Sequence, residues 1–173
     1  IDNYGDSLYT GNATHQDNHA KSEMWAIQRH YGLAKYTPTT GISVIVDNTS
    51  GNFTPGAGWW TGAYGNYYGS NYHVRGTQAI SDVSTFNYSL AASGSYKVYA
   101  WWADGTNRST GTPYIISRSG GTSTVNVNQQ VNGGKLNLLG TYTINSGANT
   151  VKVSCWAASG YFVIADAVRI TNQ

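Results

Sequence analysis

Charged residues are scarce in this sequence. Only 10% of its 173 residues are Asp, Glu, Lys or Arg, against about 25% in an average soluble protein. The formal net charge of +2 comes from scattered Lys and Arg rather than from a basic run, so the chain lacks the electrostatic footprint of a nucleic-acid-binding protein. We therefore expect no nucleic-acid partner, and a surface built from Asn, Ser, Thr, Gly and Tyr.

Cysteine and long hydrophobic runs are also lacking. Cys155 is the only cysteine, which excludes an intramolecular disulfide and a cysteine-based metal framework. No apolar run approaches the roughly 20 residues that a membrane span requires. The chain begins at Ile1 and shows no signal peptide, so we expect a processed product or a fragment of a longer protein. These features together favour a soluble, secreted, extracellular monomer with no membrane partner.

The hydrophobic pattern divides the chain into two parts. Residues 1–40 contain a helical pattern from about Asn18 to Tyr31, which predicts a short N-terminal helical segment or linker, or the end of a preceding domain. From Ile42 onward the pattern has a period of two, in eight or nine short runs rich in Val, Ile, Thr and Tyr. Residues 41–173 are therefore predicted to form an all-β module, an antiparallel β-sandwich of the jelly-roll, galactose-binding-like kind.

Alternation within a strand assigns side chains to its two faces. In "SYKVYAWW" Trp102 shares the parity of Val98 and is predicted to be buried, whereas Trp101 shares the parity of Lys97 and is predicted to face outward. The same argument puts Trp156 outside in "TVKVSCWA". In the last run Asp166 falls at core parity, where a carboxylate needs a partner. Either a bulge turns its side chain away, or an Arg side chain (Arg108 or Arg75) or backbone donors meet it.

Three long segments resemble the golvesin-like domain, also described as the carbohydrate-binding domain of xanthan lyases. They are "YKVYAWWADGTNRSTGTPYIIS", "TVNVNQQVNGGKLNLLGTYTI" and "GYFVIADAVRI", and the resemblance covers about residues 42–173. It implies a noncatalytic accessory module beside secreted bacterial hydrolases, lyases or peptidases. It brings no catalytic residue and no settled ligand for the family as a whole.

Exposed aromatic rings among amides and carboxylates are suited to holding a sugar, because a pyranose stacks its C–H face on an indole while polar groups bond its hydroxyls. The partner is then a polysaccharide or cell-wall glycan. An alternative for Arg108 is structural: its guanidinium can bond backbone carbonyls or Asp166 and tie its turn to the sheet. The predicted ligand-binding residues are Tyr99, Trp101, Asp104, Asn107, Arg108 and Trp156.

Evidence for an enzyme is sparse. His15, Asp17 and His19 offer metal-ligand atoms in "THQDNH", but no fourth ligand is evident. The sequence holds no G-x-S-x-G elbow and no distinct carboxylate pair for glycosidase chemistry. We therefore predict no catalytic residue, no metal site and no cofactor, with a structural calcium left open. The competing class is a structural or interaction domain that packs against its parent catalytic domain without binding glycan.

Overall fold

A computed structural model describes residues 41–173. The predicted N-terminal helix, the segment 1–40 and the His15, Asp17 and His19 group lie outside the described residues. The described part contains twelve strands: β1 (Ser43–Asp47), β2 (Phe53–Thr54), β3 (Trp60–Gly62), β4 (Tyr72–Gly76), β5 (Val83–Leu90), β6 (Gly94–Trp101), β7 (Thr112–Arg118), β8 (Gly121–Val127), β9 (Asn137–Ile144), β10 (Gly147–Ser154), β11 (Phe162–Ala165) and β12 (Ala167–Thr171).

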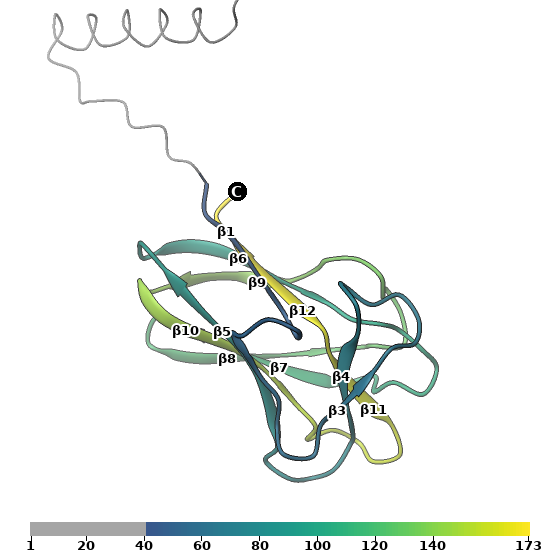
Figure 1. Ribbon diagram of the computed structural model, residues 1–173. Coiled ribbons are helices and arrows are strands. Elements are labelled where there is room, and N and C mark those ends of the chain that lie inside the picture. Colours follow the sequence, from purple (N-terminus) through teal and green to yellow (C-terminus); the bar gives the residue numbers. More distant parts are fainter. Residues whose placement is uncertain (1–40) are drawn as a thin grey trace, which may run out of the picture. The chain divides into compact units, whose positions relative to one another are not determined.

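The strands form three sheets, and each pairing between named strands is antiparallel. A four-stranded sheet has the order β1-β12-β6-β9, a five-stranded sheet the order β2-β5-β10-β7-β8, and a small sheet the order β11-β4-β3. The two larger sheets face each other, and the small sheet lies at one end of them (Figure 1). The predicted antiparallel all-β class is confirmed. Residues 41–173 include no helix that is long and apolar enough to cross a membrane.

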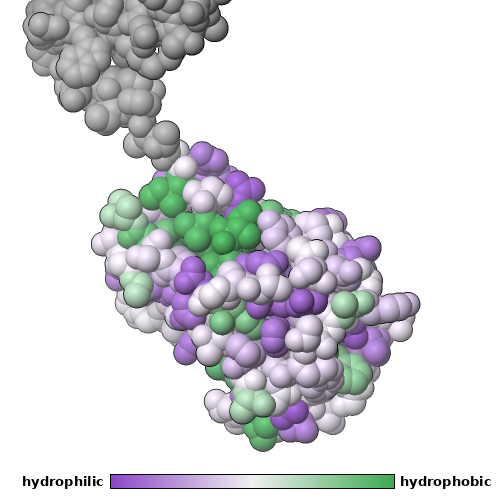
Figure 2. Space-filling model, in the orientation of Figure 1, coloured by the Kyte–Doolittle hydropathy of each residue, from purple (hydrophilic) through white to green (hydrophobic). Residues whose placement is uncertain are grey.

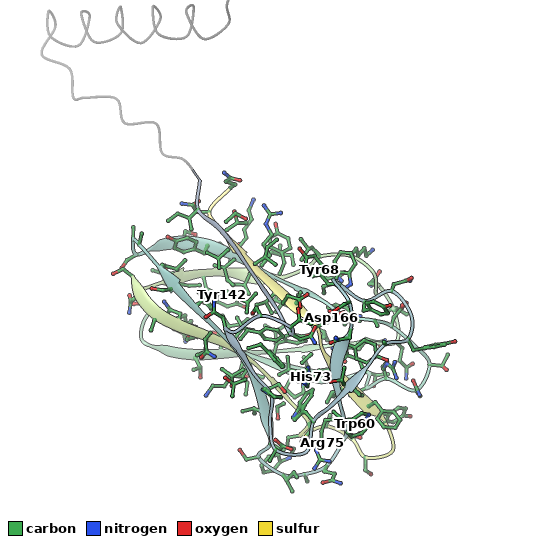
Figure 3. All side chains as sticks on the ribbon, viewed as in Figure 1. Trp60, Tyr68, His73, Arg75, Tyr142 and Asp166 are labelled. Carbon is green, nitrogen blue, oxygen red and sulfur yellow. The ribbon has the colours of Figure 1, made fainter. Side chains whose placement is uncertain are left out.

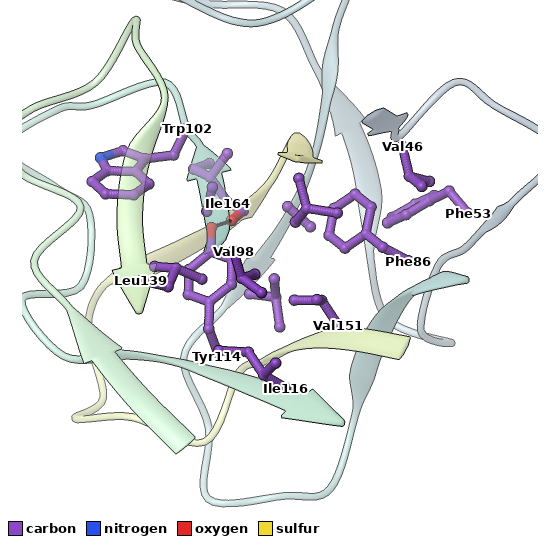
Figure 4. Packing of buried hydrophobic residues seen from close by; sticks show 14 of the residues in the cluster. Val46, Phe53, Phe86, Val98, Trp102, Tyr114, Ile116, Leu139, Val151 and Ile164 are labelled. Carbon is purple, nitrogen blue, oxygen red and sulfur yellow. Dashed lines mark hydrogen bonds between the residues drawn. The ribbon is translucent and has the colours of Figure 1, made fainter. Parts of the chain in front are cut away.

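The core forms between the two larger sheets because alternate residues of their strands point inward. In β5 the inward set includes Phe86, whose ring lies 4.8 Å from that of Phe53. In β6 it includes Val98, which pairs in register with Ile170 of β12. Figure 4 shows Phe53, Phe86 and Val98 among the buried side chains that come from both sheets. The period-two pattern therefore builds one continuous hydrophobic core.

The adjacent tryptophans at the end of β6 behave as their parity predicts. Trp102 is buried in the core, and its indole N–H donates to the carbonyl of Val131 over 3.0 Å. Trp101 lies on the outer side of the same sheet, where it is half-buried. The burial of Trp102 is confirmed, whereas Trp101 is less open than its parity alone indicates.

A buried glutamine joins the small sheet to the loop after β8. The side-chain oxygen of Gln129 accepts from the backbone N–H of Ile164 over 2.8 Å, and its amide nitrogen donates to the Ile164 carbonyl, also over 2.8 Å. The same nitrogen lies 3.2 Å from the Tyr114 hydroxyl. Gln129 thereby satisfies both backbone groups of a residue in β11, two positions from Phe162, and fixes the place where the small sheet meets the core.

Candidate functional site

A shallow pocket of about 280 Å³ opens on the small sheet. Its walls come from β3, from the loop that follows β3, from β4 and from the first residue of β11, and one side chain reaches it from the turn after β6. Its volume is near the lower end of the roughly 300–1,000 Å³ typical of small-molecule sites. The lining residues are Trp60, Gly62, Ala63, Tyr64, Tyr72, Val74, Arg108 and Phe162.

Exposed aromatic rings form the rim of this pocket. Trp60 is 47% exposed and Tyr64 is 79% exposed. The Trp60 ring meets that of Phe162 edge-on, with 6.1 Å between ring centroids, and Figure 3 shows Trp60 beside the small sheet. Trp59, the preceding residue, is buried, so this pair of tryptophans is divided between the two faces of the chain. The rim presents ring surface to solvent without disturbing the core.

Tyr72 and Arg108 form the floor. A Cβ added to Gly62 would lie 2.6 Å from the Tyr72 ring, so the absence of a side chain at Gly62 gives that ring its space. The Tyr72 hydroxyl accepts from Arg108 Nη2 over 3.1 Å, and the guanidinium carbon lies 5.7 Å from the Tyr72 ring centroid. Arg108 is only 6% exposed. A cationic group thus lies at the base of a pocket with an aromatic rim.

The turn that carries Arg108 is tied to the small sheet. The backbone N–H of Ser109 donates to the Phe162 carbonyl over 2.8 Å, and the Phe162 N–H donates to the Asn107 carbonyl over 3.0 Å. Arg108 Nε donates to the Ala103 carbonyl over 3.4 Å. The structural role predicted for Arg108 is therefore confirmed for a backbone carbonyl, while Asp166 is not among its partners.

Tyr99 and Trp101 lie elsewhere, on the outer face of the four-stranded sheet. Tyr99 is half-buried and pairs in register with Leu138 of β9. The Trp101 indole N–H donates to the Asn66 carbonyl over 2.8 Å, and its ring meets the Tyr68 ring edge-on at 5.5 Å. The segment 66–68 therefore covers part of the Trp101 ring.

The remaining predicted residues occupy separate positions. Asp104 lies against the loop after β8, where a Cβ on Gly133 would be 2.5 Å from the Asp104 backbone nitrogen. The side-chain oxygen of Asn107 accepts from Arg108 Nη1 over 2.8 Å. Trp156 follows β10 and is 59% exposed. Of the six predicted residues, Arg108 alone lines the pocket on the small sheet.

Asp166 is buried between β11 and β12, as predicted, but its partner is not an arginine. Both carboxylate oxygens accept from the backbone N–H of Tyr68, over 3.2 and 3.1 Å, and Figure 3 shows the two residues as neighbours. Burial raises the pKa of Asp166 to about 8; the Tyr68 hydrogen bond opposes this shift, and the negative charge of Asp47 adds to it. Arg75, the other candidate, instead pairs with Asp82 at 3.1 Å.

Side chains able to bind a metal do not gather in the part of the chain that the structure describes. Across residues 41–173, no three His, Cys, Asp or Glu side chains come together at a place that could hold a metal ion.

A second hollow, of about 390 Å³, lies over the five-stranded sheet. Amide and hydroxyl side chains dominate its lining, and its only aromatic residue, Tyr88, is buried. It therefore differs from the pocket on the small sheet by having no exposed ring. The lining residues are Asn52, Asn87, Tyr88, Ser89, Ser117, Ala148, Asn149 and Thr150.

Sequence reasoning did not select the aromatic residues of the pocket. Trp60 belongs to the run "GWW", where the parity argument used for Trp101 and Trp102 applies equally, so a signal was present. Tyr64 and Phe162 carried no sequence signal for a binding site. Nothing in the sequence indicates that a loop tyrosine and a phenylalanine at core parity line the same pocket. Their convergence depends on the pairing of β3 and β11 with β4.

Comparisons with known proteins place the chain in a family. The Golvesin C-terminal domain model matches residues 44–172. The structure is similar to that of a Paenibacillus xanthan lyase, with 39% identity and a TM-score of 0.70 over 76% of this chain. The match spans only 13% of the lyase. A comparison with curated protein sequences found no match.

Two further solved structures share the fold at lower identity. A family 35 carbohydrate-binding module from Clostridium thermocellum has 16% identity and a TM-score of 0.57, with coverage of 73% of this chain and 97% of the module. A Podospora anserina GH26-CBM35 β-(1,4)-mannanase has 19% identity and a TM-score of 0.55, with coverage of 74% and 27%. The family match and the 39% identity to the lyase are decisive, and the chain belongs to the Golvesin C-terminal domain family.

Proposed function

We propose that this chain is a noncatalytic accessory module of a larger secreted bacterial enzyme and binds carbohydrate at the pocket on the small sheet. The observation that carries the proposal is the exposed pair Trp60 and Tyr64 at the rim of a preformed pocket. Flat aromatic rings suit the apolar C–H face of a sugar, and their rigidity limits the entropy lost on binding. The hollow over the five-stranded sheet is the weaker choice because it offers no stacking ring.

The comparisons support an accessory role. The similar lyase is much longer than this chain, because the match covers 76% of this chain and only 13% of the lyase. The fold is also shared with a separate carbohydrate-binding module. Because fold alone does not assign a ligand, the proposal depends on the aromatic pocket. A parent enzyme that acts on polysaccharide would gain local substrate concentration from a module that holds the same polymer.

The test is binding of the isolated protein to a panel of neutral and acidic polysaccharides by affinity gel electrophoresis. We expect retardation by at least one polymer and at least about tenfold weaker binding in Trp60→Ala, which loses a stacking surface. Trp156→Ala is the matched control, because it removes an equally large exposed ring outside the pocket. If Trp156→Ala or Trp101→Ala loses binding while Trp60→Ala keeps it, the glycan binds at the residues first predicted from the sequence.

A second candidate is an interaction surface for the parent enzyme. Ile45 of β1 and Leu138 of β9 are exposed on the outer face of the four-stranded sheet. They end a register row whose inner members are Arg169 and Tyr99. Hydrophobic side chains also gather around β1 on the face seen in Figure 2. Exposed apolar surface of this kind favours contact with another protein domain. If no polysaccharide in the panel binds, this structural role is the better account of the module.

A further inference from the structure

We infer that the sugar taken by this pocket is acidic and that Arg108 binds its carboxylate. The inference rests on the proposed function and adds the chemical class of the ligand. Its starting point is the burial of Arg108, which is only 6% exposed and lines the pocket floor. Within residues 41–173 the ion pair of Arg75 with Asp82 is the only one between side chains, so no carboxylate in this part of the chain neutralises Arg108. A buried charge without a counterion is costly to maintain.

The hydrogen bonds of Arg108 leave two of its N–H donors available for a ligand. A guanidinium has five N–H donors. Three of them are used, by the Ala103 carbonyl, the Asn107 side-chain oxygen and the Tyr72 hydroxyl, and all three acceptors are neutral. One further N–H therefore remains on each of the two terminal nitrogens. Two donors on one planar group match the two oxygens of a carboxylate, a pairing that is stronger than a neutral hydrogen bond.

The surroundings of Arg108 favour an anion over a neutral sugar. None of the residues that line the pocket is acidic, and most of the lining is aromatic or aliphatic. A low-polarity wall strengthens the attraction between the guanidinium and an anion that reaches it. A sugar whose C–H face lies on Trp60 can direct a ring carboxylate toward the floor. Uronic acids carry such a carboxylate on the sugar ring.

The turn is held in place before any ligand arrives. Gln130 donates through its side-chain amide to the Arg108 carbonyl over 2.9 Å, and the Arg108 N–H donates to the Gly105 carbonyl over 3.0 Å. The guanidinium is likewise held by Tyr72. A preformed donor pair loses little conformational entropy when it binds an anion. The arrangement therefore suits recognition of a fixed carboxylate.

The experiment compares acidic polysaccharides with their carboxyl-reduced forms. Xanthan, polygalacturonate and glucuronoxylan are each offered to the protein in native and reduced form, and neutral glycans complete the panel. We expect at least one native polymer to bind, and its reduced form to bind at least about tenfold more weakly. Equal binding of both forms, or binding of neutral glycans only, would overturn the inference and leave the proposed function intact. Failure of every polymer to bind would overturn both.

Variants at Arg108 locate the effect. Arg108→Met keeps most of the side-chain length and removes the charge, so we expect it to bind the native polymer at least about tenfold more weakly. Arg118→Met is the control, because it changes the protein charge equally at an exposed residue outside the pocket. A folded Arg108→Met that binds the native polymer as wild type contradicts the inference. If that variant fails to fold, Arg108→Lys replaces it: this variant keeps the charge but loses the planar donor pair, so we expect weaker binding of the native polymer. Binding of the native and the carboxyl-reduced polymer by the wild-type protein is then the second measurement.

Discussion

Gln129 offers the sharpest test of how the small sheet is held. Its side chain is fully buried and bonds both the N–H and the carbonyl of Ile164 at 2.8 Å. In Gln129→Ala the Ile164 N–H loses its partner, and the Ile164 carbonyl keeps only the Tyr114 hydroxyl at 3.5 Å, in a place that has no exposed surface. A buried polar group left without a hydrogen bond costs about 1–3 kcal/mol. The unpaired N–H together with about 0.5–1.5 kcal/mol for the lost bond to the carbonyl predicts a loss of about 1.5–4.5 kcal/mol in the free energy of unfolding.

The assay is equilibrium unfolding in urea, with wild type and variants compared at the same pH. A change in midpoint at constant slope reports a change in stability alone. Gln130→Ala is the matched control: the neighbouring side chain is half-buried and makes one bond to a backbone carbonyl, so about 0.5–1.5 kcal/mol is expected. Equal losses in the two variants would refute the reasoning, because they would mean that Ile164 needs no partner from Gln129.

Two further stability predictions concern the tryptophan pair and Asp166. Trp102→Ala should lower the free energy of unfolding by about 3–5 kcal/mol because it leaves a cavity in the core. Trp101→Ala should lower it by about 1–2 kcal/mol, because it removes one hydrogen bond and part of an aromatic contact. Equal urea midpoints for the two variants would contradict this. Burial raises the pKa of Asp166 from an ordinary value of 3.8 to about 8, so between these pH values the folded protein holds a proton that the unfolded chain releases. The free energy of unfolding is therefore expected to fall as pH rises from about 4 to 8. Asp166→Asn keeps an oxygen for the Tyr68 N–H but cannot titrate, so its free energy of unfolding, measured in urea at several pH values, should change less over this range.

The period of the hydrophobic pattern was sufficient to predict much of the fold. A strand places successive side chains on opposite faces, so the sequence alone separates Trp102 from Trp101 and identifies Asp166 as a buried carboxylate. The long resembling segments likewise identify the family. These features are local or linear in the chain, which is why no tertiary information is needed to find them.

The candidate site could not be assembled in the same way. Arg108 meets Tyr72 across 36 positions in the sequence, and Asp166 meets the Tyr68 backbone across 98. The Trp101 indole meets the Asn66 carbonyl across 35 positions. Parity states which face a side chain occupies, but not which loop crosses that face.

The sequence by itself thus determined the antiparallel all-β class, the faces of the strands and the family. Only the tertiary structure decided that Trp60, Tyr64 and Phe162 line one pocket with a buried arginine, and that a backbone N–H rather than an arginine meets Asp166. The physical reason is that strand alternation is fixed by local backbone geometry, whereas a pocket on the small sheet depends on which strands pair and on the paths of the loops between them.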